Sequence, residues 1–301
     1  MPSTRPNPTP DSRPTEVPGV RFEPVVQLRE VLFPSDLSME SSHAFEHARL
    51  LAERFRARLT LYHAVEVPDP VYAHWAFNQS HEIWVHVEQT ARELLSRKAE
   101  TLQVSHSVFV ERAGSAQNAL LDFIHKSQPD LTVMATHGRE GLSHLLLGSV
   151  TERVFQNSFR PVLCVRESEH VGALPYRRIL VPTDLSLSSR LAFPMAELLA
   201  KEFGADVLAL HVIPDGPMMS AVEIPSEAWL WKFMAQAFPS VEISAQVQRG
   251  RAWERIVETA RVEKADLIVM ATRGHDSLAD RMIGSNTERV VRHAPCPVLV
   301  A

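Results

Sequence analysis

Several features are scarce in this sequence, and each scarcity excludes a class of protein. Only two cysteines occur in 301 residues. Cys164 and Cys296 each lie in an apolar stretch, which indicates buried thiols and not a disulfide framework. Lys and Arg (31) do not outnumber Asp and Glu (36), and no basic stripe is present. Nucleic acid is therefore not an expected partner. No apolar run approaches the roughly 18 residues of a membrane span, so no membrane contact is expected.

The first residues are poor in apolar side chains and rich in proline. Six prolines occur among the first twenty residues. Such a stretch cannot bury enough surface to offset its ordering entropy, so residues 1–24 are predicted to be a disordered tail. The stretch has no apolar core of the kind that a secretion signal requires. A cytoplasmic location is the expectation.

The remainder of the sequence is an internal duplication. Asp184 lies 148 positions after Asp36, and the same spacing relates Ala44 to Ala192, Phe45 to Phe193, Phe55 to Phe203 and His63 to His211. Further on, the segment from Asp130 (DLTVMATHG) matches the segment from Asp266 (DLIVMATRG) at a spacing of 136. A chain of this length suits two domains. We predict that they span residues 25–168 and 176–301, here called the first and second halves.

Within each half, short apolar runs alternate with helical patterns. Residues 31–33 and 179–181 are continuous apolar runs, as expected of a strand covered on both faces. Further strands are predicted from Leu59 and Val207, at 104–110 and 241–247, after Asp130 and Asp266, and at 162–165 and 298–301. Between the second and third predicted strands of the first half, residues at helical spacing form one apolar face: Ile83, Val87, Ala91, Leu94, Leu95 and Leu102. This alternation predicts an α/β fold with an open, mostly parallel sheet.

The chemistry-bearing residues follow the strands. In such sheets, ligands bind beyond the carboxyl ends of the strands, where the strand order reverses. Asp36 and Asp184 follow the first strand of each half directly. A long loop then runs from Gly138 to Ser149, or from Gly274 to Ser285, and ends at a predicted helix whose free N–H groups favour an anion. Glycines also serve ordinary turns, and Ser is a common helix cap. The glycines alone therefore leave a structural role and phosphate binding equally open.

Taken together, these motifs resemble the ATP-binding universal stress proteins. That family has a loop of Gly, two residues, Gly, nine residues and Gly-Ser or Gly-Thr. In this sequence nine residues separate Gly138 from Gly148-Ser149, and nine separate Gly274 from Gly284-Ser285. The family's Pro-Thr-Asp is matched by Pro34-Ser35-Asp36 and Pro182-Thr183-Asp184. The resemblance implies two tandem, doubly wound, five-stranded parallel sheets, Rossmann-like and similar to adenine nucleotide alpha hydrolases.

The resemblance also implies a ligand, ATP or a related adenine nucleotide, with or without Mg²⁺. Asp36 and Asp184 would hold the ribose hydroxyls, backbone groups at Ala64 and Val212 the adenine edge, and the loops the phosphates. For the first half the implied contacts are Pro34, Ser35, Asp36, Ala64, Ala135, His137, Gly138, Arg139, Gly148, Ser149, Val150 and Thr151. For the second half they are Pro182, Thr183, Asp184, Val212, Ala271, Gly274, Gly284, Ser285, Asn286 and Thr287.

Two departures from the family pattern affect this expectation. Ala135 and Ala271 replace the first glycine of the loop. The second loop also carries Asp276 and Asp280, whose charges would repel a triphosphate unless a cation bridges them. The first site is therefore ranked above the second.

No catalytic machinery is evident. The sequence has no Gly-x-x-x-x-Gly-Lys-Ser/Thr loop to neutralise a transferring phosphoryl group, and His137 becomes Arg273 in the second half. The function implied is a stress-response protein with nucleotide-dependent interactions, showing at most slow ATP hydrolysis. The alternatives are an adaptor of the same fold that binds no nucleotide and acts through an unknown protein partner, and an ATP-hydrolysing enzyme with an unidentified base.

Three further features carry expectations. The fifth strands (162–165 and 298–301) would be unpaired edges, so we predict that they pair and form an intramolecular pseudo-dimer; a homodimer also stays open. His43 and His47 have a spacing that can bind zinc, but no third ligand is evident, so no metal is expected. Both histidines are expected to be exposed or half-buried. Aromatic and Met side chains at 218–234 are expected to be mainly core.

Overall fold

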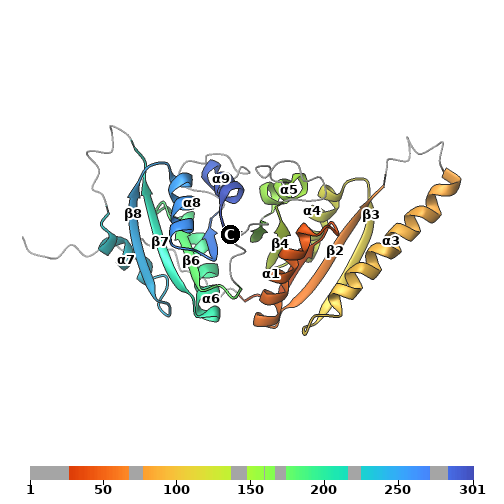
Figure 1. The fold of residues 1–301 in the computed structure, drawn as a ribbon, viewed down its shortest axis with the longest axis horizontal. Helices are drawn as coiled ribbons and strands as arrows, with labels where there is room; N and C mark the ends of the chain where they lie inside the picture. Colours follow the sequence, from red (N-terminus) through yellow and green to blue (C-terminus); the bar gives the residue numbers. More distant parts are fainter. Residues whose placement is uncertain are drawn as a thin grey trace, which may run out of the picture.

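A computed structural model describes residues 27–67, 77–136, 148–158, 160–166, 174–215, 225–271 and 284–301. All ten strands in these ranges belong to one sheet, in the order β3-β2-β1-β4-β5-β10-β9-β6-β7-β8. Figure 1 shows the first half on the right, the second half on the left and the C-terminus where they meet. The chain has the predicted α/β fold with a mostly parallel sheet.

The first half alternates strand and helix, as its apolar pattern predicts. Its elements are β1 (Glu30–Pro34), α1 (Glu40–Phe55), β2 (Arg58–Glu66), α3 (Phe77–Ala99), β3 (His106–Ala113), α4 (Ala116–Ser127), β4 (Leu131–Ala135), α5 (Ser149–Asn157) and β5 (Val162–Val165). β1 is a buried apolar strand because helices cover both faces of the sheet.

The second half repeats this order. Its elements are β6 (Arg178–Pro182), the 3-10 helix η1 (Ser189–Ala192), α6 (Phe193–Phe203), β7 (Asp206–Ile213), α7 (Glu227–Ala235), β8 (Ile243–Arg249), α8 (Ala252–Val262), β9 (Leu267–Met270), α9 (Ser285–His293) and β10 (Val298–Val300). Pro194 lies in the first turn of α6, where its missing N–H costs no helical hydrogen bond.

The strand order reverses beside the first strand of each half. β1 pairs in parallel with β2 on one side and with β4 on the other, and β6 pairs in the same way with β7 and β9. A parallel sheet leaves a crevice at such a point, at the carboxyl ends of the strands. The fold therefore has two equivalent positions at which the connections diverge.

The two halves join through their last strands. β5 and β10 are antiparallel, with Leu163 opposite Leu299 and Cys164 opposite Val298. The pairing that we predicted for these two edges is the one that the structure contains. It leaves β3 and β8 as the outer edges of the sheet.

Helices cover the sheet in two layers. The core on one face includes Phe45 from α1, Leu95 from α3 and Phe193 from α6. The core on the other face includes Leu120 from α4, Phe155 from α5, Ile256 from α8 and Val290 from α9. Each core draws on both halves. The two cysteines are buried in the second of these cores, as predicted.

The structure corrects several expectations about burial. Ala91 and Leu95 form the buried side of α3 as predicted, whereas Ile83 is 57% exposed and Leu94 is 42% exposed. β3 and β8 begin two residues later than predicted, because Leu59 and Val207 pair with His106 and Ile243. In the second half, Leu230 and Met234 are core.

Three individual side chains also differ from expectation. Trp229, with its ring stacked on Phe233, is 48% exposed, and Trp231 is exposed to the same extent. His47 is fully buried instead of facing solvent, because its Nδ1 forms a hydrogen bond with the hydroxyl of Tyr176. No described group of three or more His, Cys, Asp or Glu side chains could hold a metal ion.

Candidate functional site

The chain turns sharply where β1 ends. The Ser35 N–H donates to the Tyr62 carbonyl (2.9 Å), which extends the ladder by one residue. The Ser35 hydroxyl then accepts from the Leu37 N–H (3.1 Å), and Leu37 has φ of +64°. A positive φ is unusual for leucine and occurs where surrounding contacts impose it. These contacts place Asp36 at the carboxyl edge of the sheet.

The carboxylate of Asp36 is oriented by the residue two positions on. Its Oδ1 accepts from the Ser38 N–H (3.0 Å) and from the Ser38 hydroxyl (2.6 Å). The side chain is only partly buried. A carboxylate held in this way could accept hydrogen bonds from the hydroxyl groups of a sugar.

The second half repeats the same turn. The Leu185 N–H donates to the Thr183 hydroxyl (3.0 Å), and Leu185 has φ of +67°. The Asp184 Oδ1 accepts from the Ser186 N–H (3.0 Å). Asp184 is more exposed than Asp36. The two turns, Pro-Ser-Asp-Leu-Ser and Pro-Thr-Asp-Leu-Ser, thus hold an aspartate in equivalent positions.

A histidine on the neighbouring strand supports each turn. His63 Nδ1 lies 2.7 Å from the Ser35 carbonyl, and His211 Nδ1 lies 2.9 Å from the Thr183 carbonyl. A carbonyl only accepts, so the ring nitrogen donates in both halves. No functional role was expected for these two histidines, although their identity across the duplication is a signal that could have indicated one.

The helices α5 and α9 begin at the same edge of the sheet. Gly148 and Gly284 are their N-caps and, as glycines, make no side-chain capping hydrogen bond. The Thr151 hydroxyl donates to the Ala135 carbonyl (2.8 Å), and the Thr287 hydroxyl donates to the Ala271 carbonyl (3.1 Å). These bonds tie the first turn of each helix to the end of β4 or β9. Helix N-termini of this kind attract anions through their N–H groups and dipole.

The site residues predicted from the sequence therefore lie at the ends of three neighbouring strands and at a helix start. Asp36 follows β1, Ala135 ends β4, and β1 and β4 are hydrogen-bonded neighbours. Ala64 lies near the end of β2 and is partly buried, as is Val212 near the end of β7. Ser149 is exposed at the start of α5, whereas Thr151 is buried.

The other predicted contacts divide into two groups. Those inside the described ranges flank the two reversal points: Pro34, Ser35, Gly148 and Val150 in the first half, and Pro182, Thr183, Ala271, Gly284, Ser285, Asn286 and Thr287 in the second. Those outside the described residues are His137, Gly138, Arg139 and Gly274.

Comparison with known proteins identifies the family. The sequence matches the Universal stress protein family over residues 27–166 and again over residues 175–301. The chain belongs to the universal stress protein family. A universal stress protein of Mycolicibacterium smegmatis is 27% identical over 291 residues, which is 90% of this chain and 96% of that protein. One from Methanocaldococcus jannaschii is 35% identical over 142 residues, or 42% of this chain and 81% of that protein.

A solved structure shows that the fold is shared. The crystal structure of a universal stress protein from Archaeoglobus fulgidus superimposes with a TM-score of 0.71, covering 91% of this chain and 98% of that chain. The two sequences are 21% identical. In the described part of this universal stress protein, no helix is long and apolar enough to cross a membrane.

Proposed function

We propose that this universal stress protein binds ATP or a related adenine nucleotide at two equivalent sites. Binding would change its interactions with a protein partner during stress, in the cytoplasm. The two sites lie in two domains, residues 25–168 and 176–301. The observation that carries the proposal is the pairing, in each half, of an oriented aspartate with a helix start whose N-cap is glycine, across the strand reversal.

Each component of this arrangement suits one part of a nucleotide. Asp36 and Asp184 are acceptors for the ribose hydroxyls, and His63 and His211 hold the backbone that carries them. The N–H groups at the start of α5 and α9 are donors for phosphate oxygens, with Mg²⁺ as a companion of the phosphates. Ala64 and Val212 present backbone groups where an adenine edge would lie.

We infer that the first site binds more tightly than the second. Asp36 is more buried than Asp184. The second loop carries the two aspartates, Asp276 and Asp280, that would oppose a triphosphate. We propose a binding role without committed catalysis for both sites.

The test is direct. The freshly purified chain is denatured, and mass spectrometry identifies the small molecules that are released; ATP is then titrated into nucleotide-free protein by calorimetry, with Mg²⁺ or with chelator. We expect release of an adenine nucleotide and saturable ATP binding. Asp36→Asn should weaken the tighter of the two binding events by roughly tenfold or more, since a charged acceptor is lost.

Matched variants separate the sites and the alternatives. Asp184→Asn should affect only the weaker event, and Glu100→Gln, an exposed change of equal charge, should affect neither. A protein that releases no nucleotide and shows no heat with ATP would contradict the proposal. It would favour the adaptor that works through protein contacts alone.

A further inference from the structure

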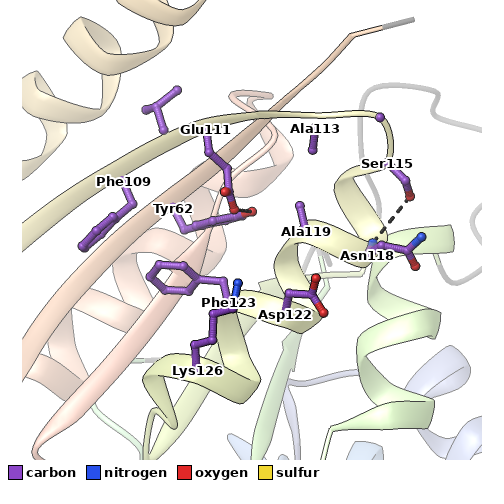
Figure 2. Close-up of a pocket in the computed structure, with 12 residues that line it drawn as sticks. Tyr62, Phe109, Glu111, Ala113, Ser115, Asn118, Ala119, Asp122, Phe123 and Lys126 are labelled. Carbon is purple, nitrogen blue, oxygen red and sulfur yellow. Dashed lines mark hydrogen bonds between the residues drawn. The ribbon is translucent and has the colours of Figure 1, made fainter. Parts of the chain in front are cut away.

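A pocket in the first half lies outside the proposed nucleotide contacts. It has a volume of about 600 Å³ and lies between helix α4 and the strands β2 and β3, of which β3 is the edge of the sheet. None of its lining residues belongs to the set of nucleotide contacts proposed above. Figure 2 shows its walls: Phe109 and Phe123 at one end, Ser115 and Asn118 at the other, and Tyr62 with Glu111 between them.

Three aromatic rings form the apolar part of this pocket. The rings of Tyr62 and Phe123 are 4.7 Å apart at their centroids, and those of Phe109 and Phe123 are 5.1 Å apart. Phe109 is 48% exposed although it is a large apolar side chain. The negative faces of such rings attract a cation that lies over them.

Two carboxylates contribute negative charge to the same pocket. Glu111 accepts a hydrogen bond of 2.6 Å from the Tyr62 hydroxyl, and Asp122 lies on α4 beside Phe123. Burial raises the pKa of Tyr62, and the bond and charge of Glu111 and the charge of Asp122 raise it further. Lys126 also lines the pocket. In the described part of the chain, no ion pair joins Glu111 or Asp122 to a basic side chain.

The second half lacks the aromatic part of this pocket. The positions equivalent to Tyr62, Phe109, Glu111 and Phe123 hold Leu210, Gln246, Gln248 and Thr259. There the Gln248 amide donates to Gln246 (3.1 Å) and to Thr259 (3.0 Å), so the polar groups satisfy one another.

The acid on the helix is also neutralised in the second half. Glu258, equivalent to Asp122, pairs with Arg255 at 2.6 Å. The position of Arg255 is Ala119 in the first half. Among the described residues, the duplication therefore gives the same fold twice, and the first half alone combines carboxylates that lack an ion-pair partner with this cluster of three rings.

We propose that this pocket binds a small organic ammonium ion. The ammonium group would lie between Glu111 and Asp122, and its apolar substituents would lie against Tyr62, Phe109 and Phe123. This site is separate from the proposed nucleotide sites and does not depend on them. It belongs to the first half alone.

The test uses choline as the probe and its neutral isostere, 3,3-dimethylbutan-1-ol, as the matched ligand. Both are titrated into the full chain at constant salt, and saturation-transfer NMR and calorimetry measure binding. We expect saturable choline binding at least tenfold tighter than that of the alcohol, since only choline carries the charge that the rings and carboxylates attract.

Matched variants locate the site. Glu111→Gln and Asp122→Asn should each weaken choline binding by roughly tenfold at most, with the thermal midpoint recorded as a check on folding. Glu100→Gln removes the same charge elsewhere on the surface and should leave binding unchanged. Equal binding of choline and the alcohol, equal losses in Glu111→Gln and Glu100→Gln, or no saturable binding of choline would each overturn the proposal.

Discussion

The Tyr176 hydroxyl lies 2.7 Å from Nδ1 of His47, in a hydrogen bond that joins the start of the second half to α1 of the first. Both side chains are buried, and their rings stack with centroids 5.7 Å apart. At the positions related by the duplication, the chain has Leu28 and Met195, which are also buried. The duplication thus has a polar pair at one set of positions and two buried apolar side chains at the equivalent positions.

Stability should fall in acid because of His47. Burial, and secondarily the charge of His43, lowers the pKa of His47 to about 4. In the unfolded chain the same group has a pKa of about 6.5. Its contribution is therefore fully present above pH 6.5 and is lost as the pH falls toward 4, by on the order of 3 kcal/mol. Denaturant titrations from pH 7 to pH 4 measure this loss.

His47→Met, which copies the residue at the equivalent position, is the control for that titration. The variant cannot be protonated there, so its free energy of unfolding should depend less on pH than that of the wild type. An identical pH dependence in both proteins would show that His47 is not responsible.

Removing both partners of the buried pair should cost less than the sum of the two single removals. Tyr176→Phe leaves His47 Nδ1 without its partner, and we expect a loss of about 1–3 kcal/mol in the free energy of unfolding. The double change His47→Met with Tyr176→Leu introduces the apolar residue types found at the equivalent positions, Met195 and Leu28. Its cost should be smaller than the sum of the two single changes, as a double-mutant cycle measures. Strict additivity would contradict the coupling.

The ion pair between Arg54 and Glu202 should contribute little. These residues occupy equivalent positions 148 apart, and Arg54 Nε lies 3.1 Å from Glu202 Oε1. The two side chains are 52% and 38% exposed, so solvent screens the pair and its contribution is about 0–1 kcal/mol. Arg54→Glu should lower the thermal midpoint slightly, and adding Glu202→Arg should restore it. A loss of several degrees or more would mean that the pair is not screened in this way.

A glycine exchange should stabilise the first half. Gly204 ends α6 with φ of +63°, and at the equivalent position Arg56 ends α1 with φ of +53°. Only glycine adopts this conformation without a steric cost. Arg56→Gly should therefore raise the free energy of unfolding by up to about 1 kcal/mol, and Gly204→Ala should lower it by about 1 kcal/mol. Chemical denaturation measures both, and changes of the same sign would contradict the argument.

The two cysteines should react only when the junction of the halves opens. Cys164 lies on β5 and Cys296 lies two residues before β10, and burial raises the pKa of each thiol to about 12. At pH 8 we expect reaction with a colorimetric disulfide reagent at least a hundredfold slower than in denaturant. Fast reaction of either thiol in the native chain would show that the β5–β10 pairing opens readily.

Part of this fold could be predicted because the information is local. The apolar run at residues 31–33 and the helical spacing from Ala44 to Phe55 depend on neighbours along the chain, and β1 and α1 occur there. Asp36 and Asp184 could be placed at a sheet edge for the same reason, since each follows a buried strand directly.

The remainder depends on packing between distant segments. Helical spacing placed Ile83 and Leu94 on the apolar face of a helix, yet α3 covers the outer strand β3 and leaves these side chains exposed. The buried state of His47 required Tyr176, which is 129 positions away. The support of the Asp36 turn by His63 likewise required the pairing of β1 with β2.

The sequence by itself determined the duplication, the alternation of strands and helices, the order of the two halves and the positions of the acidic and glycine motifs. Residue spacing and the burial periodicity of a strand or helix are properties of a continuous stretch. Only the tertiary structure decided which polar side chains are buried, how β5 meets β10 and where carboxylates gather beside Tyr62, Phe109 and Phe123. Hydrogen bonds, ring contacts and desolvation depend on segments far apart in the chain, which periodicity does not specify.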